Sequence, residues 1–286
     1  MTDEAQKAQH GLLRVLLVLA ACLALFVLTS GAIKTSAAIW ARLNPAHMQL
    51  AQSSAIALAH QYAGSTLFVL ILVCVWFALK SGDRILRWLS LGALFAVVCE
   101  VFTISLGPLQ NATYTAVVHA IFGHLGFACV AAAAIIAMTG NRDQQTVIAV
   151  SGGFPLATLA YWIPPLVLTQ VAMGALYRHD LWSVMPHMAG AMLVAFLLVS
   201  EGVILLQRVP EHRILRRVAV WSIALVLTQI SLGIADFLVR LLDFADSVVW
   251  LTLSIAHVTV AALTFTASLC LSISVRAYVS GSSSRN

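Results

Sequence analysis

Eight long apolar stretches dominate this sequence, and each is long enough to cross the hydrocarbon core of a membrane, which takes about 20 residues of helix. Of the 286 residues, 61% are hydrophobic and only 9% are charged, too few to cover a soluble globule. The apolar runs are continuous, whereas barrel strands would alternate with polar residues. We therefore expect an all-α integral membrane protein with eight transmembrane helices. The expected spans are 12–33, 55–79, 88–110, 113–138, 146–176, 184–206, 218–242 and 248–275.

The chain reads as two similar halves, with expected bounds 1–140 and 141–286. Ile104-Ser-Leu-Gly107 recurs as Ile230-Ser-Leu-Gly233, and the segment that opens at His124 is echoed at His257. Each half contains four of the expected spans. The pattern predicts a repeated four-helix bundle.

Three segments depart from simple spans. The fifth stretch is too long for one straight helix, and its Gly152-Gly153 and Pro164-Pro165 pairs predict a kink or a late start. The connection after the first span is expected to hold a short helix around 46–53. The Gly- and Ser-rich tail at 280–286 is expected to be disordered.

The distribution of Lys and Arg predicts the orientation, because cytoplasmic loops retain positive charge. Both termini are then expected in the cytoplasm, in a cell inner (plasma) membrane, with 34–54, 107–113, 177–183 and 243–247 outside. This topology also accounts for the net charge of +5 without a nucleic-acid partner. Twelve of the 16 basic residues fall on the expected inner side: Lys7, Arg14, Lys80, Arg84, Arg87, Arg142, Arg208, Arg213, Arg216, Arg217, Arg276 and Arg285.

Four histidines near the expected outer ends of spans are the candidate ligands. They are His60 and His124 in the first half and His187 and His257 in the second, about 130 positions later. Imidazoles are costly in hydrocarbon unless something binds them. Two neutral imidazoles on neighbouring helices suit the axial positions of a haem iron, and small residues beside each histidine would let the macrocycle approach. The alternative is that these small residues serve helix packing alone.

His119 competes with His124 for one ligand position, since five residues place the two about 140° apart on a helix. The repeat favours His124, which aligns with His257. His47 and His179, in outer connections, are expected to be surface residues, with contact to a cofactor propionate as the alternative.

Two acids inside expected spans are further candidates, because an intramembrane carboxylate is costly and often functional. Glu100 is predicted to act in catalysis or proton transfer, or else to make a structural hydrogen bond. Glu201 is expected to be a hydrated residue near the inner interface. Asp236, Asp243 and Asp246 are expected to face water or a basic partner at the outer end of the seventh span.

The chain resembles the haem A synthase family, eight-helix membrane proteins made of two similar halves. In the first half the likeness rests on Leu28-Thr-Ser-Gly-Ala-Ile-Lys-Thr-Ser36 and His60-Gln-Tyr-Ala-Gly64. In the second half it rests on Gln170-Val-Ala-Met-Gly-Ala-Leu-Tyr-Arg-His179, His187-Met-Ala-Gly-Ala191, Gln229-Ile-Ser-Leu-Gly233 and His257-Val-Thr-Val-Ala-Ala262.

The resemblance implies an oxidoreductase that converts the methyl substituent of haem O into the formyl group of haem A. It implies that His60 and His124 receive the haem O substrate and that His187 and His257 hold a haem b. The implied partners are the bilayer, a haem O synthase, and a respiratory oxidase or another electron-transfer complex.

Two departures from the family pattern define the alternative function. Ala57 stands where the family places a Glu, three residues before the first histidine, and Gln61 stands where an Arg is common. Such a chain would be a dihaem b-type electron-transfer or oxidase-assembly subunit without synthase activity. We expect weak synthase activity or none unless Glu100 reaches the first-half site.

Overall fold

The computed structural model describes residues 3–106, 112–139, 148–150 and 156–281, and this part of the chain is almost entirely helical. It contains eight helices that are long and apolar enough to cross a membrane, which confirms the expected class and span number. These helices are α1 (Asp3–Leu43), α3 (Ser54–Lys80), α4 (Arg84–Leu106), α5 (Ala112–Thr139), α6 (Leu156–Arg178), α7 (Val184–Arg208), α8 (Arg213–Leu241) and α9 (Val248–Tyr278).

Short elements cap the bundle at its two ends. The 3-10 helix η1 (Pro45–His47) and α2 (Met48–Ala51) follow α1, which confirms the short helix expected in this connection. At the other end, β1 (Ile148–Val150) pairs in parallel with β2 (Val279–Gly281). The start of the tail expected to be disordered is thus a strand, and 282–286 lie outside the described residues.

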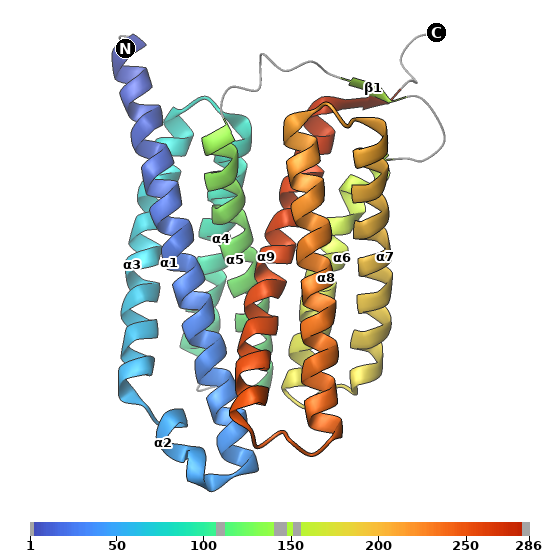
Figure 1. Cartoon of the computed structure of the whole chain (residues 1–286). Helices are drawn as coiled ribbons and strands as arrows, with labels where there is room; N and C mark the ends of the chain where they lie inside the picture. The colour runs from blue at the N-terminus through green and yellow to red at the C-terminus, as the bar shows by residue number, and fades with distance from the viewer. Residues whose placement is uncertain (1–2, 107–111, 140–147, 151–155, 282–286) are drawn as a thin grey trace.

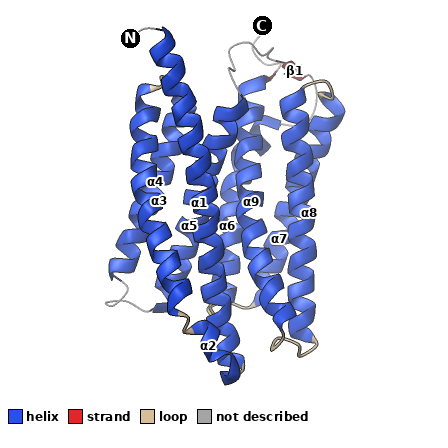
Figure 2. Cartoon of the chain, turned by 60° about the vertical axis from the view of Figure 1, so that its left-hand side comes forward, coloured by secondary structure: helices blue, strands red, loops and turns tan. Residues whose placement is uncertain are grey.

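The helices form two closed rings of four. In the first ring α1 contacts α3 and α5, and α4 contacts the same two helices. In the second, α6 contacts α7 and α9, and α8 does likewise. Figure 1 shows the rings side by side, and Figure 2 shows α1 beginning and α9 ending at the end opposite α2. The expected boundary at 140 lies outside the described residues.

Helices α5 and α9 form the centre of the contact between the rings. They contact each other, and α9 also contacts α1 while α5 contacts α6. Since α1 corresponds to α6 and α5 to α9, these last two contacts are images of each other in the repeat. Small side chains make the close approach possible: a run of alanines at 131–134 of α5 is buried.

Two helices depart from their expected bounds. Helix α6 begins at Leu156 and carries Pro164 and Pro165 in its interior, so the late start is confirmed. Helix α1 runs about ten residues beyond both expected ends. Its outer extension is kept by packing, because Trp40 clusters with Trp250 and Leu251 at the start of α9. Tertiary contacts thus extend the helix beyond its apolar run.

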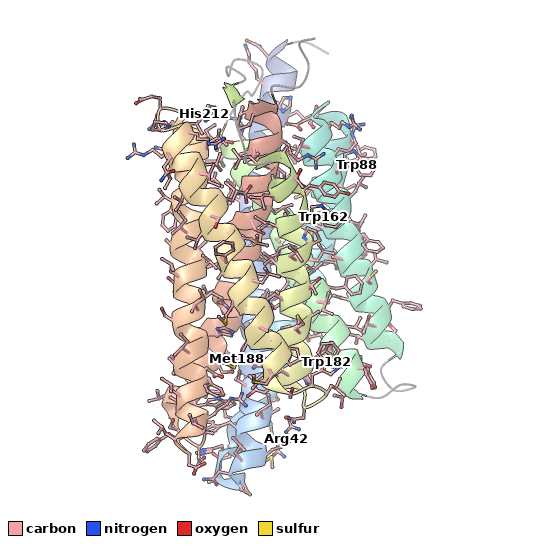
Figure 3. The ribbon with its side chains drawn as sticks, turned by 90° about the vertical axis from the view of Figure 1, so that its right-hand side faces the viewer. Arg42, Trp88, Trp162, Trp182, Met188 and His212 are labelled. Atoms are coloured by element: carbon pink, nitrogen blue, oxygen red, sulfur yellow. The ribbon has the colours of Figure 1, made fainter. Side chains whose placement is uncertain are left out.

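Exposed tryptophans lie toward both ends of the bundle, as expected for rings that sit at membrane interfaces. Trp88 and Trp162 lie toward the end where α1 begins, and Trp182 lies toward the opposite end (Figure 3). Their exposed fractions are 64%, 56% and 50%. This distribution agrees with a bilayer around the middle of the helices.

A polar contact joins the two rings at the α2 end. Asn44 Nδ2 donates to one carboxylate oxygen of Asp246 at 2.8 Å, and His47 Nε2 lies 2.8 Å from the other. The His47 ring also stacks on Trp40, with ring centroids 3.5 Å apart. Asp246 is exposed, as expected, yet its carboxylate fixes the connection after α1 to the connection before α9.

We predict that this contact weakens in acid. The hydrogen bond from Asn44, followed by that from His47, holds the pKa of the Asp246 carboxyl below its ordinary value. Its stabilisation is therefore complete above the unfolded pKa of about 3.9 and is lost as the pH falls through the lower folded value. Thermal unfolding in detergent should show Asp246→Asn less stable than wild type at pH 6, and the difference should shrink below about pH 4. A difference that is constant with pH would contradict this account.

Candidate functional site

Two pairs of histidines meet across the two rings. The rings of His60 on α3 and His119 on α5 have centroids 6.2 Å apart and planes inclined at 77°. The rings of His187 on α7 and His257 on α9 have centroids 6.3 Å apart and planes inclined at 84°. Each pair joins helices on opposite corners of its ring. The two halves thus repeat one arrangement in both distance and angle.

Three of these imidazole rings pack against glycines on the preceding helices. A β-carbon on Gly174 or Gly233 would lie 2.9 Å from Cε1 of His187 or His257, respectively. A β-carbon on Gly31 would lie 3.1 Å from Cε1 of His60. Any larger residue would push the ring away at the first two positions.

Glutamine amides contact both imidazoles of the second half. Gln170, one turn before Gly174, places Nε2 at 2.8 Å from Nδ1 of His187 and donates to the His187 carbonyl oxygen at 2.7 Å. Gln229, one turn before Gly233, places Nε2 at 3.2 Å from Nε2 of His257. The spacing of four residues puts each amide and each glycine on one helix face. In the Gln-x-x-x-Gly motif, the glycine therefore leaves room for the histidine ring, and the glutamine amide orients that ring.

The first-half pair has different partners. Nδ1 of His60 lies 3.1 Å from the carbonyl oxygen of Val27 and 3.0 Å from the Ser30 hydroxyl. Ser30 itself donates to the Val27 carbonyl at 2.9 Å. Because a carbonyl only accepts, Nδ1 of His60 is the protonated nitrogen, and Nε2 keeps its lone pair for a ligand.

Glu100 lies beside the first-half pair. Its Oε1 is 3.5 Å from Nδ1 of His119 and would lie 3.0 Å from a β-carbon on Gly123. The separation is too long for a formed hydrogen bond. The Lys34 ammonium on α1 acts electrostatically on both His60 and His119. The predicted acid thus lies beside the first-half pair, at a place where the second half has an amide.

His124, which we expected to face His60, lies elsewhere. Its side chain is buried, with 6% exposed, and its Nδ1 donates to the Ala120 carbonyl one turn earlier at 2.7 Å. Its ring also interacts with the backbone of Val258 on α9. The choice of His124 over His119 as the partner of His60 is corrected by this geometry. His124 packs between the two halves.

Unequal spacing between the repeated motifs explains the error. The Ile-Ser-Leu-Gly motif ends 24 residues before His257, but 12 residues before His119 and 17 before His124. The spacing therefore gives no register for the second histidine of the first half, whereas the sequence echo aligned His257 with His124.

Several buried polar atoms at the two pairs have no hydrogen-bond partner among the described residues. Nδ1 of His119 and Nδ1 of His257, at equivalent places in the halves, are two of them. The amide oxygens of Gln170 and Gln229 are two more. Within the described ranges no group of three or more His, Cys, Asp and Glu side chains is arranged to hold a metal ion. Each pair offers two imidazoles to a group that brings its other ligands.

The remaining intramembrane acids differ from expectation. Glu201, expected to be hydrated, is 1% exposed, and its Oε1 has no partner in the described part of the chain. Asp236, expected to face water, pairs with Arg240, with Oδ2 and Nε 3.3 Å apart. Both helices fold these side chains inward, which a span boundary alone does not indicate.

An arginine that the sequence analysis had not singled out joins the halves near the site. Arg178, one turn beyond Gly174, donates to the hydroxyl of Ser254 on α9 at 2.9 Å and to that of Ser36 on α1. Both serines are buried. Of the two loop histidines, His47 binds Asp246, as described above, and His179 follows Arg178 at the end of α6. Burial, then the neighbouring charges of Arg178 and Arg42, lower the pKa of His179.

Sequence comparison adds no relative to this description. A scan of the chain against protein-family models finds no match, and a search of curated proteins finds none either. The two histidine pairs and their surroundings therefore carry the functional argument alone.

Proposed function

We propose that this chain is a dihaem membrane protein that acts as a haem A synthase-like oxidoreductase. His187 and His257 would hold a haem b, and His60 with His119 would receive haem O, whose methyl substituent is oxidised to a formyl group. The observation that carries the proposal is the pair of matched histidine arrangements, at 6.2 and 6.3 Å. Haem supplies the redox chemistry at each place, and the chain supplies ligands, orientation and electrostatics.

The separation of the imidazoles fits axial ligation. A metal–imidazole bond of about 2.0 Å, with each ring centre about 1.1 Å behind its nitrogen, puts two ring centres on opposite sides of one metal about 6.2 Å apart. Both pairs have this spacing.

The surroundings also fit a haem. The imidazoles of His60, His187 and His257 pack against glycine backbone, with Cε1 nearest to the glycine. Ligand histidines commonly donate their second ring N–H to a carboxylate, a backbone carbonyl or water. The Val27 carbonyl fills that role for His60, and Glu100 is nearest to it for His119.

Glu100 supports synthase chemistry despite Ala57. A carboxylate in a low-dielectric pocket stabilises positive charge that develops on a neighbouring group, and this is the role that Ala57 cannot fill. Glu100 approaches from α4, with Oε1 3.5 Å from Nδ1 of His119, and this proximity supports the proposal that it takes over that role.

The alternative function is electron transfer by a dihaem b-type protein, or oxidase assembly, without synthase activity. Ala57 and Gln61 favour it, because neither supplies the charge that the family places one turn from the first histidine or next to it. Both functions use the same histidine pairs. They differ in which haem can be extracted from the protein.

We also propose that both termini face the cytoplasm of a cell with this chain in its inner membrane. Basic residues concentrate at the end where α1 begins, which includes the end of α3 and the starts of α4 and α8. The histidine pairs then lie toward the outer face.

The ligand assignment predicts the haem content of four variants. Replacement of His187 or His257 by Ala should remove one of two haems and leave the first-half haem in place. Replacement of His60 or His119 by Ala should do the reverse. The matched control is His124→Ala, five residues from His119 on the same helix, which should keep both. Haem per chain and the reduced spectrum of purified protein give the measurement, and haem loss from the control with retention in His119→Ala would restore the original choice.

The synthase assignment predicts dependence on Glu100. In cells that also express a haem O synthase, wild type should accumulate haem A, and Glu100→Gln should lower its yield about 100-fold, the scale for loss of one stabilising group. Glu201→Gln, which removes a buried acid from α7, should retain the activity.

Pigment extraction decides between the two functions. Two haem b molecules per wild-type chain, with no haem A or hydroxylated precursor, would refute synthase activity and support electron transfer. Absence of haem from wild type would refute both.

The orientation predicts the behaviour of reporter fusions. Fusions after Lys80 and Arg213 should report a cytoplasmic location, and fusions near Asn111 and Asp246 an external one. The reverse pattern would place both histidine pairs toward the cytoplasm.

A further inference from the structure

We propose that the first turns of α8 bind one anionic phospholipid from the leaflet at the end where α1 begins. A depression of about 470 Å³ lies there between the α7–α8 connection and α8. The residues that line it include Arg213, Arg216, Arg217 and Trp221. This inference does not depend on the haem proposal, since no residue of the two histidine pairs takes part.

The charge of the depression suits a phosphodiester. Three arginines stand against one carboxylate, Glu211, in the lining. In the described part of the chain none of the three arginines forms an ion pair, although Arg42 and Arg240 do so at the other end. Guanidinium groups bind phosphate oxygens in pairs, which makes such a cluster a stronger phosphate site than the same number of lysines.

The helix continues from the arginines into an exposed apolar stripe. Positions 213, 217, 220, 224 and 227 follow at intervals of three or four and share one face of α8. Of these, Val220 is 47% and Leu227 51% exposed, and neighbouring Trp221 is 65% exposed. A headgroup held by the arginines would therefore place its acyl chain along this stripe. The combination fits an amphiphile and does not fit a free phosphate ion.

The leaflet supplies the ligand. Anionic headgroups gather near basic residues at a membrane surface, and basic pockets beside transmembrane helices bind such headgroups. Tryptophan favours the interface between headgroups and chains, which places Trp221 at the depth of the glycerol backbone. Lys80 and Arg84 lie at the same end of the bundle and together carry the same charge as two of these arginines. Neither residue lines this depression.

Binding to the purified full-length chain tests the proposal. Native mass spectrometry with added phosphatidylglycerol should show one lipid bound more tightly than phosphatidylcholine. Arg213→Gln with Arg216→Gln should weaken phosphatidylglycerol binding about tenfold or more. The control pair Lys80→Gln with Arg84→Gln removes the same charge and should have little effect. All four side chains are exposed, so the fold should tolerate both pairs.

Quenching of Trp221 fluorescence locates the acyl chain. Phosphatidylglycerol with brominated chains should quench wild type more than Trp221→Phe, and the difference should vanish in the Arg213/Arg216 variant. Equal weakening by the control pair would show that overall charge, not this site, attracts the lipid, and would overturn the proposal. Displacement of the lipid by inorganic phosphate at millimolar concentration, without any Trp221 quenching, would assign the arginines to a soluble anion and overturn it too.

Discussion

A β-carbon on Gly174 or Gly233 would lie 2.9 Å from the imidazole of the following helix, so helix spacing at this level is set by the histidine ring. A polar ring is costly in hydrocarbon, and the protein reduces this cost by pressing its Cε1 edge against backbone. The glutamine one turn away then reaches the ring, because the same helix face carries both residues. Separation, orientation and polar contact in the second half all follow from this one close approach.

The two halves use this spacing for different surroundings. In the second half, neutral amides contact both imidazoles, and Arg178 acts electrostatically on His257. In the first half, the acid Glu100 lies beside His119, and Lys34 acts electrostatically on both rings. Duplication of the backbone arrangement thus leaves the polar neighbours of the histidines free to differ between the halves.

Sequence patterns predicted the features that depend on long apolar runs. They failed for residues whose position depends on how the helices pack. The eight spans, the late start of α6 and the pairing of His187 with His257 were predicted from hydropathy and repeat. The partner of His60 was not, because the segment between the repeated Ile-Ser-Leu-Gly motif and the histidine differs in length between the halves. No local signal in the sequence shows whether His119 or His124 faces His60. Glu201 was expected to be hydrated because it lies close to the end of its span. The sequence did not show that its side chain points into the bundle.

The alanine-rich contact between α5 and α9 has a consequence for how such a chain could arise. The two helices occupy equivalent positions in the repeat, and the contacts of α1 with α9 and of α6 with α5 are related in the same way. A single four-helix unit meeting its own copy would bury the same surfaces about a twofold axis normal to the membrane. Fusion of two such copies requires only a connection between the end of α5 and the start of α6. A symmetric ancestor would have carried every contact in both halves. Asymmetric features, such as the contact of Arg178 with Ser36 and Ser254, must then have arisen after the fusion.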